Sequence, residues 1–272
     1  MAKFDQKDNL VIPGGVNAPG HNRINPGQKG IFNNLLSGLK DIVYPRICTI
    51  CKKSLKDTAS LDEVICAQCW GQIKKNIPPF CHSCGRHLER NNFIKNICLT
   101  CLRQPLYFDR AFSPCAYDGV LKDLIHDFKY KNKDYLGQTL SRLMIEFIKE
   151  YNLPLDPLDY IIPMPLYRSR MREREFNQAQ VLSEHIAGEF NKEVLDNILV
   201  RTRYTRTQTE LETQERFMNV KDSFSVTDED GIRHRNILLV DDVLTTGATS
   251  SEAAYALKNA GANIVFVLTL AN

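Results

Sequence analysis

Two adjacent carboxylates near the end of the chain, Asp241 and Asp242, follow the apolar run Ile237–Val240. A short loop of small and hydroxyl-bearing residues leads from them into a helical pattern; it comprises Thr245, Thr246, Gly247, Ala248 and Thr249. Free backbone N–H groups at the start of a helix bind anions, and a glycine lets the backbone approach the ligand closely. The loop therefore predicts a site for one phosphate. Carboxylates accept hydrogen bonds, so the acid pair suits the vicinal hydroxyls of a sugar phosphate such as ribose 5-phosphate.

Eight of the nine cysteines form four CxxC pairs, with 14, 11 and 13 residues between successive pairs: Cys48/Cys51, Cys66/Cys69, Cys81/Cys84 and Cys98/Cys101. Four thiolates close one tetrahedral Zn²⁺, so these residues predict two structural zinc sites with no position open to a substrate. We prefer sequential pairing, in which pairs one and two hold one ion and pairs three and four the other. An interleaved arrangement is the alternative. Redox dithiols are disfavoured because a redox CxxC usually occurs once, beside a βαβ pattern.

Alternating apolar and amphipathic segments after residue 105 predict an α/β domain with a parallel sheet. The predicted strands are Ala111–Tyr117, Asp159–Met164, Ile198–Arg201, Asn236–Asp241 and Asn263–Thr269. The predicted helices are Leu121–Phe128, Tyr135–Glu150, Asn177–Phe190 and Thr249–Ala260. The acid pair then lies at the carboxyl end of a strand, where open α/β sheets bind ligands. A capped strand–helix turn with a solvated acid pair is the alternative.

Composition divides the chain into three parts. Residues 1–30 are rich in Asn, Gly and Pro and predict a flexible tail. Residues 31–104 combine an amphipathic helix over residues 31–43 with the cysteine-rich segment. That segment has too few apolar residues for a core of its own and needs a stabilising cross-link such as a structural metal. Residues 105–272 form the larger α/β domain and contain Cys115, which we expect to be a small core residue.

The chain has 272 residues, of which 43% are hydrophobic and 25% charged, as in ordinary globular proteins. No apolar run approaches the ~20 residues of a membrane span, and no secretory signal is recognisable, so we expect a cytoplasmic protein. The net charge of +3 is too small to indicate nucleic acid binding. Residues 48–104 carry nine Lys/Arg and four Asp/Glu, and two Zn(Cys)₄ units leave them with a charge of about +1.

The stretch 237–249 closely resembles the 5-phosphoribosyl-1-pyrophosphate (PRPP) signature of type I phosphoribosyltransferases. Three further stretches follow the CxxC pairs in order: FDRAFSPCAYDGVLKDLIHDFKYKNKDYLG, IIPMPLYRSRMREREFNQAQ and RTRYTRTQTELETQERFMNV. Together they resemble the ComF family, which includes ComFC-like and GntX-like proteins, over about residues 31–272. The resemblance implies an α/β fold, with a parallel-sheet type I phosphoribosyltransferase core preceded by a small Cys-rich zinc-ribbon domain.

The resemblance also implies roles for individual residues. Asp241 and Asp242 would be catalytic and hold the ribose hydroxyls, and the loop from Thr245 to Thr249 would hold the 5-phosphate. Pyrophosphate would be bound by a loop rich in guanidinium groups, which match phosphate oxygens: Arg168, Arg170, Arg172 and Arg174. A mobile loop over residues 201–220 would close the site with Arg201, Arg203, Arg206 and Arg216. Solvated charged surfaces are the alternatives for both arginine groups, and Glu175 stands where the family usually has Gly.

These observations lead to two functions of different classes. The first is a phosphoribosyltransferase that binds PRPP with Mg²⁺ and releases pyrophosphate to an unidentified acceptor, with charge stabilisation by arginines, Mg²⁺ and the acid pair. The second is a non-catalytic PRPP-binding accessory protein for DNA uptake that works with competence proteins and contacts single-stranded DNA through ribbon residues: Lys52, Lys53, Lys74, Lys75 and Arg86. A PRPP-sensing regulator is a third, weaker option.

The cover of the site is also predictable. Only 23 residues follow the phosphate loop, and they contain one helix and one strand. We therefore expect the zinc ribbons and residues 105–135, not a C-terminal hood, to cover the site.

Overall fold

The computed structural model describes residues 46–56, 62–89, 92–104, 106–205 and 213–272, all within the unit Arg46–Asn272. The predicted tail and the predicted helix over residues 31–43 lie outside these ranges. Among the helices of the described part, none combines the length and the apolar character that a bilayer crossing requires.

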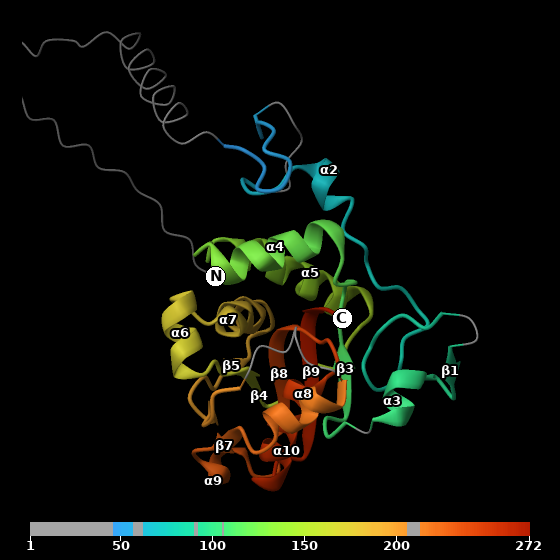
Figure 1. Cartoon of the computed structure of the whole chain (residues 1–272), viewed down its shortest axis with the longest axis vertical. Helices are drawn as coiled ribbons and strands as arrows, with labels where there is room; N and C mark the ends of the chain where they lie inside the picture. Colours follow the sequence, from blue (N-terminus) through green and yellow to red (C-terminus); the bar gives the residue numbers. More distant parts are fainter. Residues whose placement is uncertain (1–45, 57–61, 90–91, 105, 206–212) are drawn as a thin grey trace, which may run out of the picture. The chain divides into compact units, whose positions relative to one another are not determined.

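Five parallel strands form the central sheet, in the order β3-β9-β8-β4-β5 (Figure 1). Their bounds are β3 Arg110–Phe112, β4 Tyr160–Pro163, β5 Glu193–Val194, β8 Asn236–Val243 and β9 Ile264–Ala271. The central strand β8 places Ile237 and Leu239 in one hydrophobic cluster and Leu238 and Val240 in the other. Because successive side chains point to opposite faces, this strand is buried on both sides, as parallel strands usually are.

Helices cover both faces of this sheet. Helices α4 (Gly119–Tyr130), α5 (Leu136–Glu150) and α7 (Gln178–Phe190) contribute to the cluster that contains Leu238 and Val240. Helix α10 (Ala248–Asn259) contributes to the opposite cluster and also contacts α8 (Thr213–Val220). The four helices predicted from the sequence are α4, α5, α7 and α10, each correct to within two residues at both ends.

Two predicted strands need correction. Strand Ala111–Tyr117 is shorter than predicted: β3 ends at Phe112, because Pro114 has no N–H with which to continue the ladder. Only isolated bridges from Cys115 to Lys75 and to Ala271 follow. The segment Ile198–Arg201 does form a strand, β6 (Leu199–Arg201), but it pairs antiparallel with β7 (Phe224–Val226), outside the parallel sheet.

Several short elements have no counterpart in the prediction. The edge strand β5 has two residues, and the helices α6 (Arg168–Arg174) and α9 (Glu229–Ile232) have few apolar side chains. Helix α8 lies in the segment predicted to be a mobile loop over residues 201–220, so that description is wrong for Thr213–Val220. Segments this short or this polar present no stripe of apolar residues from which a helix can be recognised.

The cysteine-rich segment contains α2 (Ala67–Trp70), β1 (Phe93–Ile94), β2 (Ile97–Cys98) and α3 (Leu99–Arg103). Its first cysteine cluster, formed by CxxC pairs one and two, is buried with α4 and α5. Thr139 Oγ1 of α5 also donates a hydrogen bond of 2.6 Å to Asp62 Oδ2. Its second cysteine cluster, formed by CxxC pairs three and four, is buried with α10 in the hydrophobic core on the opposite face of the sheet. Each ribbon thus completes its core against one face of the α/β domain, as its low apolar content predicts.

The packing of α5 on α7 gives a first prediction. A Cβ on Gly137 would lie 2.3 Å from Val181 Cγ1, a stiff β-branched side chain, whereas a Cβ on Gly188 of α7 would meet nothing within 4 Å. We expect Gly137→Ala to lower the free energy of unfolding by about 1–3 kcal/mol through overpacking. The control Gly188→Ala should raise it by roughly 0.5–1 kcal/mol, because alanine favours helix.

Urea unfolding of the two zinc-loaded variants checks this prediction. Equal stability of Gly137→Ala and Gly188→Ala would contradict the close approach of α5 and α7.

Candidate functional site

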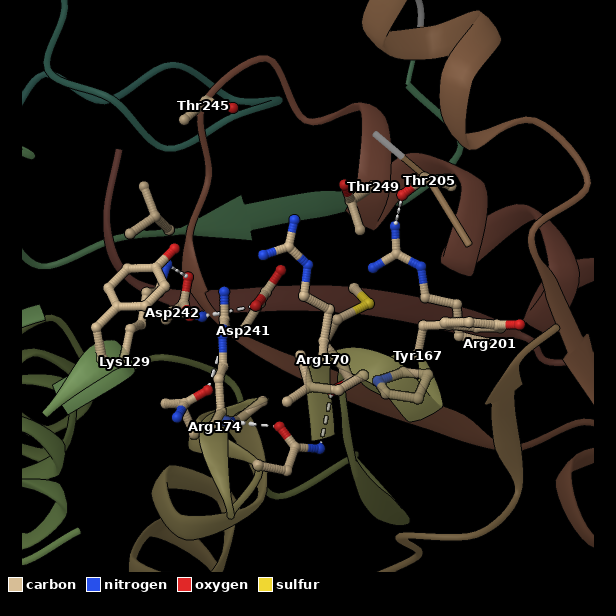
Figure 2. A pocket seen from close by; sticks show the side chains of 18 of the residues that line it. Lys129, Tyr167, Arg170, Arg174, Arg201, Thr205, Asp241, Asp242, Thr245 and Thr249 are labelled. Atoms are coloured by element: carbon tan, nitrogen blue, oxygen red, sulfur yellow. Dashed lines mark hydrogen bonds and ion pairs between the residues drawn. The ribbon is translucent and has the colours of Figure 1, made fainter. Parts of the chain in front are cut away.

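A cavity of about 610 Å³ opens where β4 and β8 end. Its described lining comes from five segments: residues 117–130 at and within α4, residues 164–179 from the end of β4 into α7, residues 201–205 from the end of β6 onward, Arg216 of α8 and residues 241–249 from β8 into α10. The predicted acid pair, phosphate loop and arginine-rich segment therefore meet at one edge of the sheet (Figure 2).

The acid pair occupies the end of β8, and each carboxylate has its own environment. Asp242 Oδ1 accepts a hydrogen bond of 2.6 Å from Lys129 Nζ, and this ion pair is 11% and 16% exposed at its two side chains. Asp241 Oδ1 accepts a hydrogen bond of 2.8 Å from the backbone N–H of Asp242. Burial, together with the neighbouring Asp242 charge, raises the pKa of Asp241 to about 7. Asp241 therefore holds a proton more readily than an exposed aspartate does.

The phosphate loop forms the N-terminus of α10. Gly247 is the N-cap residue in the left-handed conformation (φ 81°), and no side chain caps the helix from that position. Thr245 and Thr249 line the cavity, whereas Thr246, Gly247 and Ala248 make the turn behind them. The first N–H groups of the helix and the two lining hydroxyls are the donors that a phosphate requires.

Helix α6 brings two of its four predicted arginines into the cavity, Arg170 and Arg174. Figure 2 shows both side chains reaching toward Asp241. The Nε atom of Arg174 is buried without a hydrogen-bond partner, although Nη1 donates to Gln178 Oε1 at 3.1 Å. Arg168 and Arg172 are exposed and do not line the cavity, because residues four apart on a helix share one face and these two occupy the other.

The last residue of β6 is Arg201, which lines the cavity, and α8 contributes Arg216. Arg201 Nη2 donates a hydrogen bond of 2.6 Å to Thr205 Oγ1, but its Nε is buried without a partner. Burial lowers the pKa of Arg201. Arg203 instead donates to the backbone carbonyls of Asn219 and Lys221 and does not line the cavity. Arg206 lies outside the described residues.

Glu175, the residue that departs from the family pattern, ends α6 in the left-handed conformation with φ 66°. Glycine adopts this conformation without a steric penalty, which explains why glycine is the usual residue there. The Glu175 carboxylate accepts a hydrogen bond from Asn132 Nδ2 and is not part of the cavity lining. The carboxylate is therefore held away from the arginines of the cavity.

One wall of the cavity carries residues for which the sequence analysis assigned no role. Tyr117, His126, Lys129 and Tyr130 lie at or within α4, and Tyr167 and Tyr204 face the cavity from other segments. The expectation that residues 105–135 cover the site agrees with this wall. No described ribbon residue lines the cavity, so the described part of the ribbons does not form its cover. No sequence signal relates Lys129 to Asp242, because 113 positions separate them.

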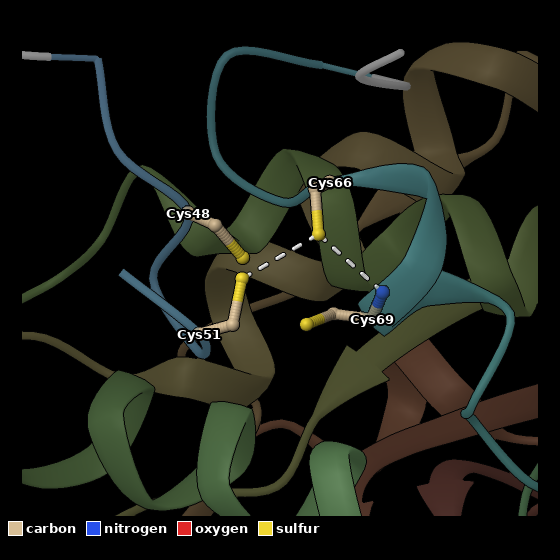
Figure 3. A group of neighbouring side chains, drawn as sticks. All are labelled: Cys48, Cys51, Cys66 and Cys69. Atoms are coloured by element: carbon tan, nitrogen blue, oxygen red, sulfur yellow. Dashed lines mark hydrogen bonds between the residues drawn. The ribbon is translucent and has the colours of Figure 1, made fainter. Parts of the chain in front are cut away.

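The cysteines form two clusters in the sequential pairing: Cys48, Cys51, Cys66 and Cys69, and Cys81, Cys84, Cys98 and Cys101. Within each cluster all sulfur atoms lie within 4.8 Å of one another. Figure 3 shows the side chains of the first cluster pointing toward one another. The separation is 3.7 Å between Cys51 Sγ and Cys66 Sγ and 3.8 Å between Cys84 Sγ and Cys98 Sγ. Zn–S bonds of ~2.3 Å in a tetrahedron separate sulfur atoms by about 3.8 Å, so both clusters are consistent with zinc.

The fold and these sites define a class of protein. A five-stranded parallel α/β sheet follows two Cys₄ clusters, in agreement with the parallel-sheet core and the Cys-rich zinc-ribbon domain expected from the sequence. The family model "Double zinc ribbon domain" matches residues 39–102.

The chain belongs to the ComF family. It is 33% identical over 212 residues to "Competence protein F" of Haemophilus influenzae, covering 76% of this chain and 90% of that protein. It is 30% identical over 226 residues to "DNA utilization protein YhgH" of Escherichia coli strain K12, covering 82% and 89%, and 25% identical to "Competence protein ComFC" of Bacillus subtilis, covering 80% and 91%.

Solved structures match the chain more distantly. A purine phosphoribosyltransferase from Pyrococcus horikoshii aligns with a TM-score of 0.30 and 16% identity, covering 50% of this chain and 72% of that chain. Similarity at this level indicates neither a ligand nor a reaction, so the function of this chain is argued below from its own site.

The raised pKa of Asp241 gives a second prediction. The folded chain keeps a proton on Asp241 up to about pH 7, whereas an unfolded aspartate releases it near pH 3.8. Between these values the folded state binds more protons, so its free energy of unfolding falls as the pH rises. Asp241→Asn removes this dependence, so the variant should gain stability relative to wild type from about pH 5 to about pH 8. Urea unfolding at both pH values measures the difference, and parallel pH curves would contradict the prediction.

Proposed function

We propose that the cavity binds PRPP with Mg²⁺ and that the chain transfers the phosphoribosyl group to an unidentified acceptor, releasing pyrophosphate. The observation that carries the proposal is the convergence of an acid pair, the N-terminus of α10, which its N-cap residue Gly247 does not cap, and two buried guanidinium Nε atoms without partners on one cavity. Buried donors without partners are rare in folded proteins, so these atoms support an anionic ligand.

The charge of the lining supports the same ligand. Its described residues include five cations, namely Lys129, Arg170, Arg174, Arg201 and Arg216, against the two carboxylates of Asp241 and Asp242. A phosphate monoester carries a charge of about −2 near neutral pH, and pyrophosphate adds more. The Mg²⁺ complex of PRPP therefore complements the excess of cationic side chains in the cavity lining.

Each group on the ligand has a matching group on the protein. Thr245, Thr249 and the first N–H groups of α10 would bind the 5-phosphate. The carboxylates of Asp241 and Asp242 would accept hydrogen bonds from the ribose hydroxyls, and Lys129 would keep Asp242 in place for this contact. Arg170, Arg174, Arg201 and Arg216 would bind the pyrophosphate.

In the reaction the bond between the anomeric carbon and the pyrophosphate oxygen breaks, and the oxygen keeps the electron pair. A lone pair of the acceptor forms the new bond to the anomeric carbon, and the acceptor releases a proton. The arginines stabilise charge that develops on the departing pyrophosphate, and the carboxylates stabilise the oxocarbenium-like ribose. Mg²⁺ bound with PRPP would supply further positive charge to the pyrophosphate.

The alternative is a non-catalytic PRPP-binding protein that assists DNA uptake, in the cytoplasm and together with competence proteins. The names of the relatives, "Competence protein F" and "DNA utilization protein YhgH", favour a connection with DNA. Most of the basic ribbon residues suggested for single-stranded DNA are already engaged. Lys52 donates to the Thr49 carbonyl, and Lys74 and Lys75 pair with acids: Asp118 and Glu146, respectively. Contact with DNA through the ribbons would have to break these interactions.

Calorimetric titration with PRPP and Mg²⁺ tests the proposed ligand. The double variant Asp241→Asn/Asp242→Asn should lose about 100-fold or more in affinity, because two charged hydrogen-bond acceptors for the ribose are removed. The exposed carboxylate Asp230, which pairs with Arg233 on the surface, provides the control Asp230→Asn with unchanged affinity. A folded, zinc-loaded wild type that produces no binding heat would exclude the proposal.

Fluorescence anisotropy with a labelled single strand tests the alternative. If the basic residues contact phosphates, the affinity should fall by about 100-fold between about 50 mM and about 200 mM salt, since counterions compete for the strand. A signal that does not depend on salt, or no signal at all, would count against binding through the ribbons.

A further inference from the structure

The turn around the second cysteine cluster, Cys81–Arg86, lies against the edge strand β3 of the sheet. The backbone N–H of Ala111 donates a hydrogen bond of 2.7 Å to the Ser83 carbonyl. Gly85 approaches β3 so closely that a Cβ there would lie 2.4 Å from the Ala111 oxygen. The turn is therefore fixed to the sheet by backbone atoms.

Arg86 extends from this turn to the phosphate loop. Its carbonyl accepts a hydrogen bond of 2.8 Å from the Cys81 N–H, so the Arg86 backbone belongs to the turn that surrounds the cluster. Its Nη2 lies 3.5 Å from the Thr245 carbonyl oxygen, the first residue of the loop. Arg86 does not line the cavity, and its Nε is buried without a hydrogen-bond partner. The guanidinium thus contacts the loop from behind.

The contact has a specific electrostatic consequence. A loop binds a phosphate when its N–H groups point at the anion and its carbonyl oxygens point away, because a carbonyl oxygen carries partial negative charge. The Thr245 side chain lines the cavity while its carbonyl is turned to Arg86. Without Arg86 that carbonyl has no cationic partner outside the cavity and is free to rotate toward the ligand.

The segment that follows the second ribbon supports the same loop. A Cβ on Gly247 would lie 3.2 Å from Leu106 Cδ2 and 3.7 Å from Phe108 Cε1. The backbone N–H of Tyr107 donates a hydrogen bond of 3.0 Å to Ser251 Oγ of α10. The first cysteine cluster lies with α4 and α5, and its nearby Asp62 is bonded to Thr139 rather than to the loop. The two clusters therefore differ in their relation to the phosphate loop.

We propose that the second Cys₄ cluster is part of the 5-phosphate subsite, with Arg86 as the positioning residue that keeps the Thr245 carbonyl turned out of the cavity. Affinity for the 5-phosphate then depends on metal in the second cluster and is independent of metal in the first. This inference rests on the proposed function and adds a residue and a metal site to it.

The first experiment compares Arg86→Ala, Arg86→Lys and the control Arg46→Ala in the zinc-loaded full chain. Arg46 pairs with Glu63 on the exposed surface of the first ribbon, so its loss should change no ligand affinity. Calorimetry uses three probes: PRPP with Mg²⁺, ribose 5-phosphate, and pyrophosphate with Mg²⁺. Arg86→Ala should weaken PRPP and ribose 5-phosphate by the same factor of about ten and leave pyrophosphate unchanged. Arg86→Lys, which retains the charge and a donor, should recover most of the loss.

The outcomes separate this inference from the proposed function. A wild type that binds none of the three probes removes the proposed function and the inference with it. A wild type that binds PRPP while Arg86→Ala binds ribose 5-phosphate equally well overturns the inference alone. Equal weakening of pyrophosphate and ribose 5-phosphate also overturns it, since that result indicates a general loosening of the cavity.

A second experiment removes one ligand from each cluster. Cys51 and Cys101 are the partly exposed members of their clusters, so Cys51→Ser and Cys101→Ser form a matched pair. Each variant should lose one zinc ion by metal analysis. Cys101→Ser should weaken ribose 5-phosphate by about tenfold or more, whereas Cys51→Ser should bind it as wild type does. Equal affinities in the two variants would overturn the assignment of the second cluster to the subsite.

Discussion

Parallel pairing of β8 with β4 on one side and β9 on the other is the constraint on which the rest of the molecule depends. It places Val240 opposite Pro163 and Asp241 opposite Thr269, so the segments that leave β4 and β8 begin at the same edge. Helix α6 and the N-terminus of α10 then necessarily flank one cavity. Because β8 is buried on both faces, the acid pair lies at the end of a strand held by packing from both sides. A mobile loop could not hold two carboxylates and a phosphate loop in a fixed relation.

The electrostatics of the cavity follow from the placement of two carboxylates and several arginines at this one edge of the sheet. Two carboxylates at adjacent positions cannot both be ionised at low cost, and the structure resolves the conflict in two ways. Lys129 neutralises Asp242 through a short, largely buried ion pair, whereas Asp241 retains affinity for a proton up to about pH 7. Arg174 and Arg201 each hold a buried Nε atom without a hydrogen-bond partner. The cavity is therefore a site of positive charge in which the protein has already arranged groups that suit an anionic ligand.

How much of this was predictable depends on the range of the interactions. Helices with a continuous apolar stripe, and the buried strands β4, β8 and β9, were predicted from local pattern. Strand β6 was recognised as a strand, but its partner β7 could not be, because antiparallel pairing across residues 202–223 leaves no local trace. Helix α6 was not predicted because its charged residues present no apolar stripe with helical spacing. That helical spacing places Arg170 and Arg174 in the cavity and leaves Arg168 and Arg172 outside it. Contacts such as Lys129–Asp242 and Arg86–Thr245 depend on tertiary structure alone.

The backbone hydrogen bond from Ala111 to the Ser83 carbonyl has a consequence for solution behaviour. Strand β3 is an outer strand of the sheet, and outer strands with free N–H and C=O groups pair readily with other chains. The turn of the second ribbon occupies part of this edge, and the opposite edge, β5, is only two residues long. The turn of the second ribbon therefore shields part of the sheet edge, and loss of its order would expose backbone N–H and C=O groups with which a second chain can pair.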